Sequence, residues 1–312
     1  MAASTVAIYN PASAGGRTDK RMQHWSVSLS EAFPDLALRP TEHPEHATQI
    51  ARDALFAGAE TIIAVGGDGT VSECVNGFFR GGENIAPDAA FGFIMSGTGG
   101  DIRRTYDIPA AFEDQLRILR ERNLRRIDIG HLRYTNHAGS RAERVFMNTL
   151  SFGMSGKVCT AVKEGLIGRI GGKTSFYLAA LKGALAHRNQ TVRLRFDDRE
   201  ETHLMNTVAI GNGRYFGGRM MIAPKAVPDD GQFDLVVVGN LNRWEVLTSM
   251  SMLYHGTHID HSKVSTDRLD ALEADSDERV LIECDGEGPG RLPLSVRLLP
   301  RALNLIVPKG RK

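Results

Sequence analysis

The segment Gly66-Gly67-Asp68-Gly69-Thr70 comes directly after the apolar run at residues 61–65, and it constrains the fold more than any other part of the chain. A short β-branched run without polar alternation is typical of a strand buried on both faces of a parallel sheet. Residues 71–79 then have a helical pattern, so the glycines lie at a strand-to-helix turn. Glycines there let backbone N–H groups approach an anion, and the helix amino terminus adds partial positive charge. The segment therefore predicts a phosphate-binding turn.

Asp68 lies in the middle of this turn. Its carboxylate would repel a phosphate unless a metal ion or a hydroxyl lay between them. The position therefore favours a site that binds phosphate and Mg²⁺ together. The alternative is an ordinary glycine-rich turn in which the aspartate only caps the helix.

Composition limits the functions open to the chain. Its 312 residues exceed the usual size of one domain, so we expect two. Basic and acidic residues number 38 and 37 and are interleaved, which argues against a nucleic-acid partner. Cys74, Cys159 and Cys284 are far apart and odd in number, which indicates reduced thiols and a cytoplasmic protein. No apolar stretch approaches the ~18 residues of a transmembrane helix, so we expect any membrane association to be peripheral.

The first part of the chain alternates strand-like and helix-like segments, with strands predicted at 5–9, 36–39, 61–65 and 91–94. This repeat predicts an α/β domain with a doubly wound parallel sheet. Small-residue loops at 10–16, 66–70 and 96–101 follow three of these strands. Because the carboxyl ends of parallel strands lie at one edge of the sheet, all three loops should open on the same crevice.

From about residue 127 the pattern changes to half-solvated antiparallel strands. Strands are predicted at 145–150, 192–196, 205–210, 233–238, 279–283, 294–298 and 303–307. One helix is predicted at 173–187. A second begins at an Asn242…Glu245 capping box and is expected to bury Trp244, Leu247, Met250 and Tyr254. The domains are predicted at 1–129 and 130–312, with the tail from about 300 returning to the first.

Four segments together resemble the diacylglycerol kinase catalytic-domain superfamily, which includes bacterial lipid kinases and the sphingosine and ceramide kinases. They are the loops at 10–16 and 66–70, the segment Gly97-Thr98-Gly99-Gly100-Asp101-Ile102-Arg103-Arg104, and Asp285-Gly286-Glu287. The block at 211–224, followed by Asp229-Asp230-Gly231, adds a longer match. Gly100 replaces the family's asparagine and Arg219 a usual glycine. The 66–70 turn alone also occurs in NAD kinases and phosphofructokinases.

The resemblance implies an ATP-binding α/β domain, similar to that of NAD kinases and phosphofructokinases, and a mainly antiparallel C-terminal β-sandwich that accepts the lipid, with ATP in the cleft between them. Carried over by motif, the nucleotide-binding residues are Asn10, Thr41, Gly66, Gly67, Asp68, Gly69, Thr70, Val71, Ser72, Thr98 and Asp101.

The resemblance also implies the catalytic residues. Asp68 acts on a catalytic Mg²⁺, supported by Asp101 and Asp128, and Asp285 is the general base, assisted by Glu287. Phosphoryl transfer to an alcohol needs such a base and neutralised phosphate charge. An Asp-Gly pair is also a common hairpin signal, so an ordinary turn is the alternative for Asp285.

A second, structural Mg²⁺ is implied at Asp230, with the backbone carbonyls of Val227 and Gln232 as further ligands. The run Met220-Met221-Ile222 nearby lines a lipid pocket or belongs to ordinary core.

The expected function is an ATP- and Mg²⁺-dependent lipid kinase that phosphorylates the hydroxyl of a diacylglycerol-like lipid at a membrane surface. An NAD kinase-like small-molecule kinase and a catalytically silent lipid- or nucleotide-binding regulator are the alternatives. The resemblance is also compatible with a homodimer.

Overall fold

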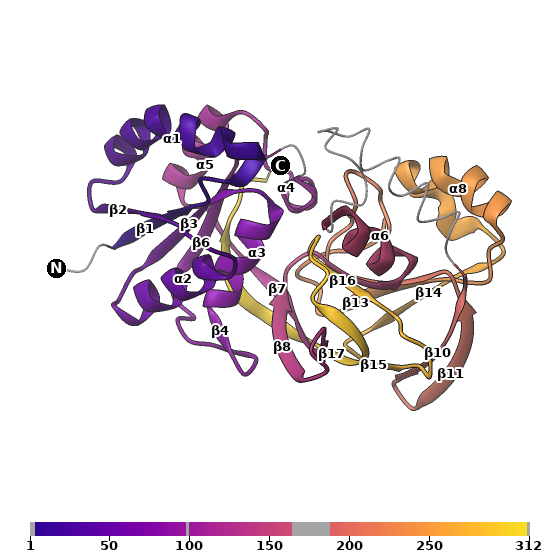
Figure 1. Cartoon of the computed structure of the whole chain (residues 1–312). Helices are drawn as coiled ribbons and strands as arrows, with labels where there is room; N and C mark the ends of the chain where they lie inside the picture. The colour runs from indigo at the N-terminus through magenta and orange to yellow at the C-terminus, as the bar shows by residue number, and fades with distance from the viewer. Residues whose placement is uncertain (1–3, 98–99, 164–187, 311–312) are drawn as a thin grey trace. The chain divides into compact units, whose positions relative to one another are not determined.

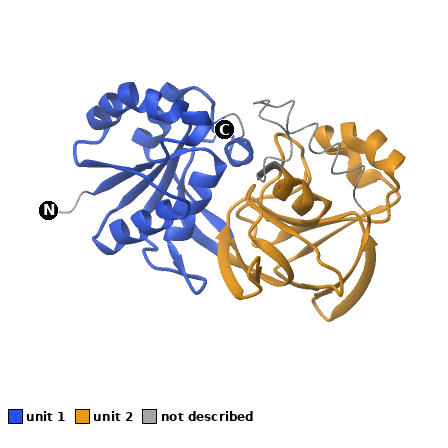
Figure 2. Ribbon diagram, in the orientation of Figure 1, with its two compact units in different colours: residues 1–129, 300–312 blue, residues 130–299 orange. Residues whose placement is uncertain are grey.

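The computed structural model describes residues 4–97, 100–163 and 188–310 (Figure 1). The chain divides into two compact units, one of residues 1–129 and 300–312 and one of residues 130–299 (Figure 2). Thr98 and the helix predicted at 173–187 lie outside the described residues.

Unit 1 contains a parallel sheet with the strand order β17–β6–β3–β1–β2. Its strands are β1 (Thr5–Tyr9), β2 (Leu36–Pro40), β3 (Thr61–Gly66), β6 (Ala90–Met95) and the end of β17 (Gly290–Ile306). Every residue of β3 and β6 is buried, as their unbroken apolar sequences predict. From β1 the chain continues to the neighbouring strand on one side, β2, and from β3 it continues to the other side, β6. Open α/β sheets bind ligands at such a switch point, which here lies between β1 and β3.

In the described part of unit 1, the helices between these strands are α1 (Ser13–Ala32), α2 (His46–Phe56) and α3 (Asp68–Gly77), and α4 (Asp101–Thr105) and α5 (Phe112–Glu121) both follow β6. Trp25 of α1 stacks on Phe112 of α5 with ring centroids 4.5 Å apart. A short hairpin of β4 (Phe79–Arg80) and β5 (Glu83–Asn84) follows α3.

Unit 2 is built on antiparallel pairs. One sheet has the order β14–β13–β12–β9–β16, and the other strands of the unit pair as β11–β10–β15–β17, with β7 beside β17 and β8 beside β7. The strands are β7 (Leu124–Asn136), β8 (Arg141–Phe146), β9 (Thr149–Gly153), β10 (Gln190–Phe196), β11 (Arg199–Met205), β12 (Thr207–Gly211), β13 (Phe233–Val238), β14 (Val264–Leu269), β15 (Ala271–Asp275) and β16 (Ile282–Cys284).

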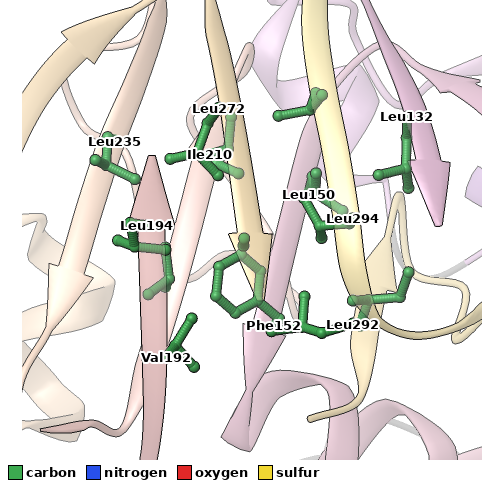
Figure 3. Packing of buried hydrophobic residues seen from close by; sticks show 14 of the residues in the cluster. Leu132, Leu150, Phe152, Val192, Leu194, Ile210, Leu235, Leu272, Leu292 and Leu294 are labelled. Atoms are coloured by element: carbon green, nitrogen blue, oxygen red, sulfur yellow. The ribbon is translucent and has the colours of Figure 1, made fainter. Parts of the chain in front are cut away.

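Alternate residues from both sheets form one core in unit 2. Phe152 and Ile210 of the first sheet lie in the same cluster as Leu194, Leu272 and Leu294 of the second (Figure 3). The predicted combination of an α/β domain with a mainly antiparallel β-sandwich is confirmed. Helix α6 (Met154–Lys163), which the sequence did not predict, follows β9 directly.

Helix α8 (Arg243–His255) begins at the predicted capping box, in which Asn242 accepts hydrogen bonds from the amides of Trp244 and Glu245. Of the four residues predicted to be buried, Met250 is buried and Leu247 is half-buried, whereas Trp244 and Tyr254 are 78% and 39% exposed. Val246 is buried as well. Apolar residues occur on more than one face of this helix, so spacing alone did not decide which stripe packs inward.

Within the described ranges, no helix combines the length and apolar character that crossing a bilayer requires.

Candidate active site

The carboxyl edge of the unit 1 sheet brings together the predicted nucleotide-binding loops. The amide of Asn10, after β1, donates to the Val65 carbonyl at 3.1 Å, and the amide of Ser96, after β6, donates to the Gly66 carbonyl at 2.8 Å. The amide of Thr41, after β2, donates to the Tyr9 carbonyl at 2.9 Å. Residues from four consecutive parallel strands therefore converge on one edge.

The turn between β3 and α3 is tight. A Cβ atom at position 66 would lie 2.4 Å from Thr70 Oγ1, so only glycine fits there. Gly67 precedes the helix in an extended conformation and has no side chain to cap it. The first amides of a helix have no partner within that helix, which suits them to bind phosphate oxygens.

The later residues of this predicted site are largely enclosed. Thr70, Val71 and Ser72 are 5%, 0% and 1% exposed. A nucleotide at this turn would therefore contact the backbone at Val71 rather than its side chain.

Asp68 joins two of the loops. Its Oδ2 accepts a hydrogen bond from the Gly100 amide at 2.8 Å, and its Oδ1 accepts one from the Ile102 amide at 3.3 Å. Burial raises the pKa of Asp68, and the neighbouring charge of Asp101 raises it further. Asp101 in turn forms an ion pair with Arg104 at 2.9 Å.

Asp68 and Asp101 supply carboxylate oxygens of the kind that Mg²⁺ binds, and each Asp68 oxygen accepts one of the hydrogen bonds described above and keeps a second lone pair. Mg²⁺ binds a few carboxylate oxygens together with substrate phosphates rather than a complete protein cage.

The first loop carries a hydroxyl network that the sequence analysis missed. Ser13 Oγ lies 2.5 Å from Thr18 Oγ1, which lies 2.6 Å from Ser96 Oγ. Arg21 Nη1 donates to the Ser96 carbonyl at 2.5 Å. Asn10 Oδ1 accepts a hydrogen bond from the Ala12 amide at 2.9 Å, so its side-chain oxygen shapes the loop. Local sequence patterns do not reveal the contacts of Thr18 and Arg21 with Ser96, which lies 78 and 75 positions away.

Asp128 has a structural contact. It is fully buried on β7, and its Oδ1 accepts a hydrogen bond from the Arg301 amide at 2.7 Å. This contact attaches the returning end of the chain to unit 1.

Asp285 and Gly286 form the centre of a two-residue hairpin in unit 2. The Cys284 amide donates to the Glu287 carbonyl at 2.7 Å, and the Glu287 amide donates to the Cys284 carbonyl at 2.9 Å. Both central residues have positive φ, 48° and 85°. Asp285-Gly286 therefore does form a hairpin turn, as the alternative interpretation expects. Whether Asp285 has a further role depends on where its carboxylate lies.

The Asp285 carboxylate lies in a cradle of three backbone amides. Met147 donates to Oδ2 at 3.0 Å, and Asn148 and Thr149 donate to Oδ1 at 3.0 and 2.9 Å. Burial raises the pKa of Asp285 to about 6, although these hydrogen bonds and the charge of Arg144 lower it. Oδ2 accepts one amide and has capacity for a second donor.

The same contacts explain an error in the predicted strands. The expected single strand at 145–150 is two strands, β8 and β9, interrupted at Met147 and Asn148. At the interruption the amides turn toward Asp285 instead of continuing one ladder.

Two asparagines that the sequence analysis missed hold this cradle. Asn148 Nδ2 donates to the Tyr215 carbonyl at 2.6 Å, and Asn212 Nδ2 donates to the Met147 carbonyl at 2.9 Å. Asn212 and Tyr215 belong to the block at 211–224, so part of that motif supports the Asp285 site. Asn212 could have been found through that block. For Asn148 the signal was its position directly before the buried strand β9.

Glu283 also holds the hairpin. Its Oε2 accepts a hydrogen bond from Ser151 Oγ at 2.5 Å, and its Oε1 accepts one from the Gly286 amide at 2.6 Å. Glu287, which was predicted to assist the base, is half-buried, and its backbone closes the turn.

An apolar cavity of about 130 Å³ lies in unit 2 and reaches this hairpin. Glu283 and Gly286 line it, together with Met220 and Ile222, which fits the lipid-pocket alternative for that run. Val158 of α6 and Val246 and Met250 of α8 also line the cavity.

At the predicted structural metal site, Asp230 and the Val227 carbonyl accept hydrogen bonds from groups of this chain. Arg268 donates to Asp230 Oδ2, and the Gln232 amide donates to Asp230 Oδ1 at 3.2 Å. The Val227 carbonyl accepts the amides of Asp229 and Asp230 at 2.9 and 3.4 Å.

Comparisons with known families cover nearly the whole chain. The diacylglycerol kinase catalytic domain matches residues 4–132, and the YegS C-terminal NAD kinase beta sandwich-like domain matches residues 148–307. A probable lipid kinase YegS-like of Chromohalobacter salexigens is 30% identical over 287 residues, 90% of this chain and 87% of that protein. A diacylglycerol kinase of Staphylococcus haemolyticus is 26% identical over 302 residues, 97% of this chain and 87% of that protein.

Solved structures share the fold. A putative diacylglycerol kinase from Bacillus anthracis has a TM-score of 0.76 at 22% identity, with 98% of this chain and 97% of that chain covered. Yeast NADH kinase has a TM-score of 0.57 at 11% identity, with 99% of this chain and 84% of that chain covered. The chain belongs to the diacylglycerol kinase family, with a catalytic domain followed by a YegS-type C-terminal domain.

Proposed function

We propose that the protein is an ATP- and Mg²⁺-dependent lipid kinase that phosphorylates the hydroxyl of a diacylglycerol-like lipid. The observation that carries this proposal is the hairpin at Asp285, which combines an anchored carboxylate with the edge of an apolar cavity. A pKa of about 6 leaves this carboxylate ionised at neutral pH and able to accept a proton. The apolar walls suit an acyl chain.

ATP is proposed to bind at the carboxyl edge of unit 1. Backbone amides of the turn at Gly66 and Gly67 and of the α3 amino terminus would hold the phosphates, with Asn10 and Thr41 at the neighbouring strand ends. Asp68 and Asp101 would hold Mg²⁺, which neutralises developing charge on the phosphate oxygens when bound.

The proposed reaction needs one proton transfer and one displacement. Asp285 accepts the proton of the lipid hydroxyl as the hydroxyl oxygen bonds to the γ-phosphorus of ATP. The bond between that phosphorus and the oxygen bridging it to the β-phosphate breaks. The products are a lipid phosphate and ADP. Glu283 and Glu287 would keep the hairpin in place through the contacts described above.

A panel of acceptors tests this function. Purified protein is incubated with Mg²⁺ and ATP labelled at the γ-phosphate, and with diacylglycerol, monoacylglycerol, ceramide, sphingosine or NAD, and the products are separated by thin-layer chromatography. We expect label in a lipid phosphate. Label only in NADP would support the NAD kinase alternative, and no transfer to any acceptor would support a silent binding protein.

The pH dependence of kcat should report Asp285. Below about pH 6 its carboxylate is protonated and cannot accept the hydroxyl proton, so kcat should fall as the pH decreases through that value. The charge of Arg144 lowers the pKa of Asp285, so Arg144→Gln should raise that pKa and move the acidic limb to higher pH. Arg133→Gln, at a side chain that is 64% exposed, is the control and should leave the limb in place. If Arg144→Gln leaves the acidic limb of the kcat profile at the same pH, a group other than Asp285 causes the decrease.

Trp244 is proposed as a membrane contact. It is 78% exposed on the first turn of α8, whose buried residues Val246 and Met250 line the apolar cavity. Tryptophan favours membrane–water interfaces. Trp244→Ala should weaken binding to anionic vesicles by roughly tenfold, equivalent to about 1.4 kcal/mol of burial.

The matched control is Phe56→Ala in unit 1, which removes another exposed aromatic side chain, 63% exposed. It should bind vesicles like the wild type. Activity of Trp244→Ala on a water-soluble short-chain diacylglycerol should be unchanged. Equal vesicle binding by Trp244→Ala and the wild type, measured by co-sedimentation, would exclude this contact.

A further inference from the structure

Strand β14 places an arginine beside the loop before β13, where the family resemblance implies a cation. Arg268 of β14 donates to Asp230 Oδ2. The strand register fixes this arginine, because Arg268 lies directly opposite Asp234 in the antiparallel pair of β13 and β14. Side chains of directly opposite residues lie on the same face of a sheet. The β-ladder therefore places Arg268 beside Asp234, and the Arg268 side chain reaches Asp230.

Two of the three expected ligands, Asp230 and the Val227 carbonyl, already accept hydrogen bonds. Asp230 Oδ1 accepts the Gln232 amide at 3.2 Å, which closes the turn around Gly231. The Val227 carbonyl accepts the amides of Asp229 and Asp230 at 2.9 and 3.4 Å, and a carbonyl oxygen has two lone pairs. A cation bound to both Asp230 Oδ2 and the Val227 carbonyl would have to displace Arg268 and one of these amides.

The local charges balance without a metal. Asp230 and Asp234 lie in one pocket with Lys225 and Arg268. Asp234 is 8% exposed, and its buried Oδ2 has no hydrogen-bond partner among the described residues. Asp267, the third acidic residue of the pocket, pairs with Arg199 at 2.8 Å. Two positive side chains thus face two carboxylates, and a divalent ion would add uncompensated charge.

We infer that in this chain the guanidinium of Arg268 takes the place of the structural cation at Asp230. The loop is held by an ion pair between Arg268 and Asp230, and the folded protein needs no divalent ion there. This inference goes beyond the proposed function, because it concerns how unit 2 is stabilised and not phosphate transfer.

Thermal unfolding in EDTA and in millimolar MgCl₂, without nucleotide, tests the inference. An ion that binds only the folded state raises Tm by mass action. The wild type should shift no more than Asp230→Asn does, whereas Mg²⁺ should stabilise Arg268→Met by roughly 5 °C more, because loss of the arginine frees an Asp230 oxygen. Arg268→Lys keeps the charge and should not respond.

Two further variants identify the site. Arg199→Met removes the neighbouring pair with Asp267 and is the matched control, so it should gain no response to Mg²⁺. Asp230→Asn added to Arg268→Met should abolish the gained response. Stabilisation of the wild type by Mg²⁺ that Asp230→Asn removes would overturn the inference, and so would an Arg268→Met variant as insensitive as the wild type.

If Arg268→Met does not fold, calorimetric titration of Mg²⁺ into the wild type and Asp230→Asn decides the question. Equal Mg²⁺ binding by the two proteins supports the inference that Arg268 replaces the cation. Mg²⁺ binding that is lost in Asp230→Asn contradicts it. None of these readouts uses phosphate transfer, so failure of the proposed kinase activity would leave the result unaffected.

Discussion

Asp285→Asn should lower kcat for phosphate transfer to diacylglycerol by ~10²–10⁴-fold, the contribution of a positioned general base. The KM for ATP should change little, because the predicted phosphate-binding amides belong to unit 1. Steady-state kinetics with mixed micelles of diacylglycerol measure both constants. The loss should be similar for every lipid alcohol accepted, since the base acts on the hydroxyl that they share.

The same substitution should also lower Tm. An asparagine would direct an NH₂ group at one or two of the N–H donors of Met147, Asn148 and Thr149, and leaving such a buried donor unpaired costs about 1–3 kcal/mol. Glu287→Gln, in the same hairpin but half-buried, is the control and should cause a smaller loss of Tm. Wild-type kcat in folded Asp285→Asn would mean that Asp285-Gly286 is only a turn.

Asp68→Asn should reduce kcat/KM for MgATP by more than ~10²-fold. The amide loses the negative charge proposed to hold Mg²⁺, and its NH₂ group opposes the amide of Gly100 or Ile102. The loops that Asp68 joins should then lose part of their fixed geometry. Kinetics over a range of Mg²⁺ concentrations, with nucleotide affinity measured by calorimetry, separate loss of metal from loss of binding.

The control for this variant is Asp114→Asn, at a surface ion pair with Arg117 whose side chains are 45% and 59% exposed. Exposed pairs contribute little to stability, so its kinetics should match the wild type. Near-normal activity of Asp68→Asn with unchanged Mg²⁺ dependence would remove Asp68 from the mechanism.

Apolar runs, the alternation of strands and helices, and a capping box predicted much of this fold from residues close together in the sequence. The apolar runs of β3 and β6 required burial on both faces, and the β–α alternation required parallel strands. The convergence of Asn10, Gly66 and Ser96 at one edge followed from that topology. The capping box at Asn242 was likewise predicted from residues three positions apart.

Contacts between distant residues could not be predicted in this way. The break at Met147 and Asn148 exists because their amides donate to Asp285, 138 and 137 positions away. Arg268 meets Asp230 through the register of β13 and β14. Which stripe of α8 packs inward depends on the cavity wall that it completes, and Trp244 was accordingly misplaced. The spacing of apolar residues along the chain does not determine this strand break, this ion pair or this buried helix face.

The central claim is that the chain transfers the γ-phosphate of ATP to a lipid hydroxyl through Asp285. The most direct measurement compares 1,2-diacylglycerol with its O-acetylated derivative as acceptors of γ-labelled phosphate, using wild-type protein and Asp285→Asn. For wild-type protein with the unblocked lipid, we predict label in the organic phase and an equal amount of ADP. Asp285→Asn should give at least ~10²-fold less label, and the O-acetylated lipid should give none with either protein. Equal labelling by Asp285→Asn, or ADP release without labelled lipid from the wild type, would contradict this account.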